Sequence, residues 1–141
     1  MKTHLVFALI LSGSILLAQN VPANISELNQ IQNIYSFSLI NSNLKATVLA
    51  DQKFDHARKG DYIIVPLDSV KSRFERLLKE SGERFVYVWT CRNGIDCIDA
   101  VVFDGAELRR GSTIAIDLGL DFDRAKRVAY LLNDLMESYN N

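Results

Sequence analysis

Apolar residues recur three or four positions apart in three segments of the chain, a spacing that predicts helices. The longest segment predicts a C-terminal helix with Asp121 or Asp123 as its N-cap. Its apolar face comprises Phe122, Ala125, Val128, Ala129, Leu132, Leu135, Met136 and Tyr139. A shorter segment, from Ile25 to Tyr35, predicts a helix near the start of the domain.

The third segment follows Asp68, whose carboxylate can accept hydrogen bonds from the first turn of a helix. One face of that helix would carry the apolar side chains of Val70, Phe74, Leu77 and Leu78. Gly82 can adopt the left-handed conformation that ends many helices. We therefore expect a middle helix between Asp68 and Gly82.

Strands are predicted where apolar and polar residues alternate or form short apolar runs. Phe37–Leu39 and Leu44–Val48 alternate on either side of Asn41-Ser42-Asn43, which predicts a hairpin. Further strands are predicted at residues 61–65, 84–91, 97–103 and 113–117. The charged stretch 51–60 predicts a loop, and Arg109-Arg110 beside Gly111 predicts a surface turn.

The predicted order is helix, strands, helix, strands, helix. Because strands and helices do not alternate regularly, we expect an α+β domain with a mainly antiparallel sheet. Two or three helices would pack against this sheet. The length fits one domain, which we assign to residues 19–141.

Two cysteines punctuate the strongest strand signals in the chain. Cys91 ends one predicted strand and Cys97 begins the next, and the connection between them contains Asn93-Gly94, which favours a hairpin. If Cys91 faces Cys97 directly, the pair is close enough for a disulfide. In that register Trp89 would face Asp99, and Tyr87 would face Val101.

This hairpin supplies the candidate binding residues. The disulfide would present Arg92, Asn93 and Asp96 on a rigid loop, which lowers the entropic cost of binding a partner. The face with Tyr87, Trp89 and Asp99 is a second candidate surface, since aromatic residues are enriched at interfaces. The alternatives are that the disulfide only stabilises the hairpin and that the aromatic face is a second layer of the core.

The N-terminus predicts export. Lys2 precedes an apolar run, and Ala18 is a small residue suited to cleavage, as in secretory signal peptides. We assign residues 1–18 to the signal and expect a periplasmic or extracellular protein without integral membrane association after cleavage. An uncleaved anchor is the alternative. Two cysteines in an exported chain favour a disulfide.

Charge and composition exclude several functions. The net charge is −1 and becomes −2 after loss of Lys2, because 15 basic residues then face 17 acidic ones, so we expect no nucleic acid partner. His56 is the one histidine left after cleavage, too few for a histidine metal cluster. Asp117, Asp121 and Asp123 lack the remaining residues of a calcium loop. We expect no catalytic residue, metal or cofactor, and therefore no enzyme.

A protein partner fits these expectations best. The sequence favours an inhibitor or immunity-type protein that blocks a secreted enzyme or toxin through the loop. The strand–Cys–loop–Cys–strand segment resembles the protruding loop of periplasmic lysozyme inhibitors, although the connection here is longer and has no histidine. The alternatives are a periplasmic accessory or ligand-binding module and an unrecognised hydrolase.

Overall fold

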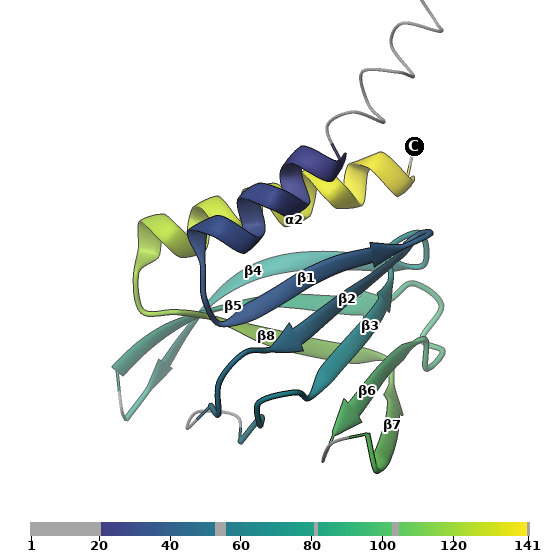
Figure 1. Ribbon diagram of the computed structural model, residues 1–141, viewed down its shortest axis with the longest axis horizontal. Coiled ribbons are helices and arrows are strands. Elements are labelled where there is room, and N and C mark those ends of the chain that lie inside the picture. The colour runs from purple at the N-terminus through teal and green to yellow at the C-terminus, as the bar shows by residue number, and fades with distance from the viewer. Residues whose placement is uncertain (1–20, 53–55, 81, 103–104, 141) are drawn as a thin grey trace, which may run out of the picture.

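The computed structural model describes residues 21–52, 56–80, 82–102 and 105–140 (Figure 1). Residues 21–31 are helical, and the second helix, α2, spans Phe122–Asn140. The strands are β1 Tyr35–Ile40, β2 Asn43–Val48, β3 Tyr62–Pro66, β4 Val70–Lys79, β5 Gly82–Cys91, β6 Ile98–Val102, β7 Glu107–Gly111 and β8 Thr113–Gly119. The α+β class and the antiparallel strand arrangement are confirmed.

The strands form two antiparallel sheets, one of five strands in the order β1-β2-β3-β6-β7 and one of three in the order β4-β5-β8. Three times the chain turns a corner from one sheet to the other, between β3 and β4, between β5 and β6, and between β7 and β8. β3 and β4, β5 and β6, and β7 and β8 therefore form three long segments, each of which bends between the two sheets. The three segments pair side by side as one antiparallel meander. The bend brings the inner faces of the two sheets together.

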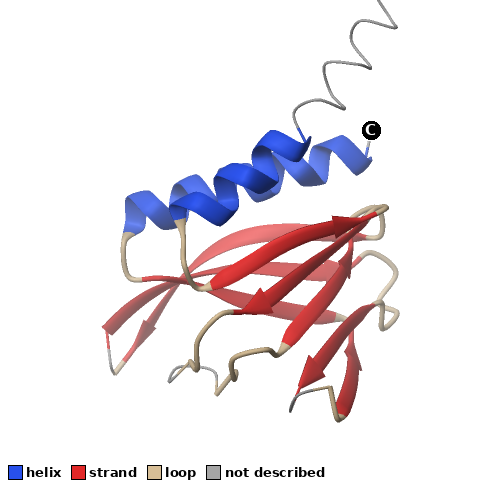
Figure 2. Ribbon diagram, in the orientation of Figure 1, coloured by secondary structure: helices blue, strands red, loops and turns tan. Residues whose placement is uncertain are grey.

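Both helices lie on the same side of the sheets, next to each other (Figure 2). Asn24 donates to Asp134 at 2.6 Å and Arg127 pairs with Glu27 at 2.6 Å, which joins the two helices. The backbone N–H of residue 124 donates to the Asp121 carboxylate at 3.1 Å, so Asp121 is the cap of α2. The largest fully buried side chains are Trp89, Tyr87, Phe37, Leu28, Leu44, Leu67, Ile98, Leu131, Leu132, Leu135, Val65 and Val70.

The predicted middle helix is wrong, because residues 70–79 form strand β4. β4 pairs with β5 along its whole length, with Ser72 opposite Trp89 and Phe74 opposite Tyr87. Lys71 and Arg73 alternate with these core-facing positions and are exposed, which is the period of a strand. The same apolar residues fit a helix and a strand, and the pairing with β5 decides between them.

The predicted register across the cysteines is also wrong. β5 pairs with β4 and β8, whereas β6 pairs with β3 and β7, so Trp89 does not face Asp99 and Tyr87 does not face Val101. The Cys91–Cys97 disulfide itself is present, with 6.0 Å between the two Cα atoms. It closes the loop at the corner where the chain leaves one sheet for the other.

The remaining strand predictions are confirmed with one exception. The β1–β2 hairpin, β3, β8 and the C-terminal helix form where the sequence predicts them. The first helix is present but spans residues 21–31, so its predicted end is wrong, because Tyr35 begins strand β1. The predicted turn at Arg109-Arg110 is wrong, since both residues belong to β7, which pairs with β6. The predicted signal peptide at residues 1–18 lies outside the described residues. Neither helix in the described part of the chain is long and apolar enough to cross a membrane.

Candidate functional site

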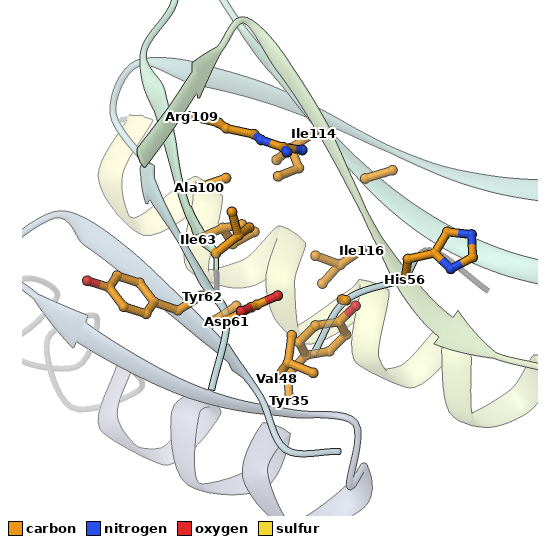
Figure 3. Close-up of a pocket in the computed structure, with 14 residues that line it drawn as sticks. Tyr35, Val48, His56, Asp61, Tyr62, Ile63, Ala100, Arg109, Ile114 and Ile116 are labelled. Atoms are coloured by element: carbon orange, nitrogen blue, oxygen red, sulfur yellow. The ribbon is translucent and has the colours of Figure 1, made fainter. Parts of the chain in front are cut away.

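A cavity of about 330 Å³ lies between the inner face of the five-stranded sheet and strand β8 of the other sheet (Figure 3). This volume is near the lower end of the range for small-molecule sites. Most of its wall is apolar. The lining residues are Tyr35, Ala46, Val48, His56, Ala57, Asp61, Tyr62, Ile63, Ala100, Val102, Arg109, Ile114, Ala115 and Ile116.

The cavity follows from one row of paired residues across the five-stranded sheet. Phe37 pairs with Ala46, Ala46 with Ile63, Ile63 with Ala100, and Ala100 with Arg109. Directly paired residues of antiparallel strands project from the same face, so this row points toward β8. Two of its middle positions are alanine, and their small side chains leave the space between the sheets open.

In the neighbouring row of paired residues on the same face of the sheet, larger side chains fill the space between the two sheets. Leu44 pairs with Val65 one step closer to the corners, and both side chains are fully buried. Ile98, on β6, is buried beside them in the same core. There the two sheets are packed together. The change from Leu44 to Ala46 along β2 and from Ile98 to Ala100 along β6 therefore sets where the core ends and the cavity begins.

Two buried polar side chains lie at the end of the cavity away from the corners. The Tyr35 hydroxyl accepts a hydrogen bond from the backbone N–H of Asp117 at 3.2 Å. The Asp61 carboxylate accepts one from the backbone N–H of Arg58 at 3.0 Å, which ties the loop before β3 to the strand. Both groups face a cavity whose wall is mostly apolar, so they can orient a ligand that enters it.

The rim carries charge. Arg109 extends from β7 beside Ile114, and His56 lies at another side of the cavity (Figure 3). Arg109 donates from Nε to Glu107 at 2.8 Å. That hydrogen bond and the charge of Glu107 raise the pKa of Arg109, so the guanidinium stays protonated. His56 has a φ of 60°, the left-handed conformation.

Two links hold the sheets together on either side of the cavity. At the corners, the disulfide joins the end of β5 to the start of the β6 segment. At the other end, Tyr35 of β1 reaches the backbone of Asp117 in β8. The cavity lies between these links and is flanked by the edge strands β7 and β8.

The structure separates the six predicted partner-binding residues. Arg92, Asn93 and Asp96 are exposed on the disulfide-closed loop, and Arg92 donates to the side chain of Asn140 in α2 at 3.0 Å. Asp99 lies on β6 and pairs with Arg110 at 2.8 Å. Whether any of these residues binds a partner stays a prediction.

The predicted aromatic face belongs to the core, which decides between the two interpretations left open. Tyr87 and Trp89 are both 0% exposed and make an edge-to-face contact, with ring centroids 5.0 Å apart. The Tyr87 hydroxyl donates to Asn133 at 2.6 Å and bonds Ser72 at 2.7 Å. Burial raises the pKa of Tyr87 to about 12. The indole N–H of Trp89 is buried and has no hydrogen-bond partner within the described part of the chain.

The acidic residues near the C-terminus have structural contacts. Asp117 is buried and pairs with Arg84, and it also accepts from the backbone N–H of Gly119 at 2.9 Å. Asp121 caps α2, and Asp123 lies in its first turn. The described residues contain no group of three or more histidine, cysteine, aspartate or glutamate side chains arranged to hold a metal ion.

Sequence reasoning missed the cavity residues. Ala46, Ile63 and Ala100 look like ordinary strand residues in the sequence. The one signal in the sequence for these residues is that Ala46 and Ala100 are small residues inside strongly apolar strands. That signal gains meaning only when the register places both alanines beside Ile63.

Comparison with known proteins finds no family model, no curated protein and no solved structure that matches this chain. Its function is therefore argued from the geometry of the site.

Proposed function

We propose that this protein is an exported binding protein that holds a small, largely apolar ligand in the cavity between its two sheets. The observation that carries the proposal is the row in which Ala46 and Ala100 flank Ile63 and leave an apolar space open to a strand edge. A ligand buried there would gain the stabilisation of apolar surface removed from water. No catalytic step is part of the proposal.

Export is supported by the sequence of residues 1–18 and by the disulfide, since disulfides persist mainly in oxidising compartments. A protein in such a compartment meets small molecules outside the cytosol. The proposal therefore places ligand capture in the periplasm or outside the cell.

The cavity volume sets the size of the ligand. A water molecule takes about 30 Å³ of liquid, and a methylene group is of similar size, so a cavity of about 330 Å³ holds about ten heavy atoms. 1-Octanol is a suitable probe because it has this size and carries no charge. For a ligand so small, we expect a Kd of about 1 mM.

The test is an amide chemical-shift titration of the mature protein with 1-octanol. Ala100→Leu fills the cavity and is expected to remove saturable binding, since its side chain would occupy the space beside Ile63. Ala106→Leu is the matched control, because Ala106 is exposed in the turn before β7. Absence of saturable shifts in the wild type, or equal affinities for wild type and Ala100→Leu, would rule out the cavity as the binding site.

A second candidate function is protein binding through the disulfide-closed loop. The observation in its favour is that Ile95 is 65% exposed on this loop, between the charged residues Arg92 and Asp96. An inhibitor or immunity-type protein would use such a loop to contact a secreted enzyme or toxin. Affinity capture with the wild type and with an Arg92→Ala, Ile95→Ala variant tests it, and a partner retained equally by both would exclude the loop.

A further inference from the structure

The charges around the cavity distinguish between ligand classes of the same size. Arg109 lies at the rim, and its side chain extends alongside Ile114 over the apolar wall (Figure 3). The Asp61 carboxylate lies inside, next to the buried Tyr35. A ligand with one apolar end and one charged end would therefore meet a cation at the rim and an anion within.

We propose that the ligand is an amphipathic monocarboxylate whose apolar chain enters the cavity and whose carboxylate binds Arg109 at the rim. This inference rests on the proposed function. The opposite orientation is unfavourable, because it would bring the ligand carboxylate close to Asp61 in a largely apolar surrounding.

Arg109 can bind a ligand carboxylate while it remains bonded to Glu107. A guanidinium carries five N–H donors in a planar fork. Arg109 donates from Nε to Glu107, and 62% of its side chain is exposed, so a ligand carboxylate can reach the guanidinium from solvent. The fork suits the two oxygens of a carboxylate. Because the Arg109 side chain is 62% exposed, solvent screens the attraction, and we expect a preference of about fivefold for the acid over the neutral alcohol.

The same strand provides a matched control. Arg110 follows Arg109 in β7, is 61% exposed, and is also bonded to a carboxylate, that of Asp99. Alternate residues of a strand point to opposite faces, so Arg110 projects away from the side that Arg109 occupies. Neutralising Arg110 changes the net charge by the same amount without changing the charge at the rim.

The experiment compares the affinities of octanoate, 1-octanol and octylammonium by chemical-shift titration for the wild type, Arg109→Gln and Arg110→Gln. We expect octanoate to bind about five times more tightly than 1-octanol to the wild type and to Arg110→Gln. In Arg109→Gln the two affinities should become equal, while 1-octanol binding persists.

The outcomes separate this inference from the proposed function. Binding of 1-octanol without a preference for octanoate would overturn the monocarboxylate assignment and leave the cavity proposal standing. Tighter binding of octylammonium than of octanoate would overturn it as well, as would a preference that survives in Arg109→Gln. Failure of all three probes to bind would contradict both proposals.

Discussion

Replacement of both Cys91 and Cys97 by alanine measures what the disulfide contributes at the corner between the sheets. The cross-link closes a loop with a sequence separation of 6, for which the loop-closure relation gives about 2 kcal/mol at 25 °C. Alanine is preferable to serine here, because Cys91 is buried and a serine hydroxyl would need a hydrogen-bond partner.

We expect the double variant to fold, since the buried core extends over both sheets and both helices and Cys91 is one of its many members. Urea unfolding of the oxidised wild type and of the double variant should differ by about 2 kcal/mol in free energy of unfolding. The slope of that free energy against urea should change little, because so short a loop scarcely compacts the unfolded chain. Reductant should lower the stability of the wild type and leave the variant unchanged.

Two results would refute this reasoning. Equal stabilities would show that the disulfide does not constrain the unfolded chain. A loss well beyond about 4 kcal/mol, or a much lower urea dependence, would show that the two sheets separate without the cross-link.

Three further predictions concern Tyr87, Tyr35 and residues 1–18. Below pH 10 the burial of neutral Tyr87 has its full effect on stability. Between pH 10 and about 12 this tyrosine ionises first in the unfolded chain, so it should lower the free energy of unfolding by about 1.4 kcal/mol per pH unit; the difference in that free energy between wild type and Tyr87→Phe, measured by urea unfolding at alkaline pH, should change with this slope. Tyr35→Phe removes the hydrogen bond to the buried backbone N–H of Asp117 and should cost about 1–3 kcal/mol by urea unfolding, whereas unchanged stability would show that the hydroxyl does not satisfy that group. Intact-mass measurement of the exported protein should show loss of residues 1–18, and retention of that segment would indicate an uncleaved anchor.

Local sequence signals predicted the elements whose stabilising contacts are near in the chain. The β1–β2 hairpin follows from alternation on both sides of a short turn, and Asn41 takes the φ of 56° that such a turn requires. The cap of α2 follows from Asp121 in front of an apolar helical face. These features depend on neighbours within a few residues.

The errors arose where distant pairing decides the structure. The apolar residues of 70–79 fit a helix as well as a strand, and only the partner strand β5 selects β4. The cysteines suggested a reversal of the chain, whereas the strands on either side of them pair in different sheets. The cavity depends on the register of β2, β3 and β6, so its residues could not be predicted from spacing along the chain.

The most direct test of the ligand cavity is the measurement of intermolecular nuclear Overhauser effects between the methylene protons of bound octanoate and the methyl groups of the protein. The account predicts contacts to Ala46, Ile63 and Ile114, which line the cavity. Leu78 and Leu120 are exposed apolar residues outside it, at 75% and 65% exposure, and should show none. Contacts to Leu78 and Leu120 without contacts to the cavity residues would contradict the account.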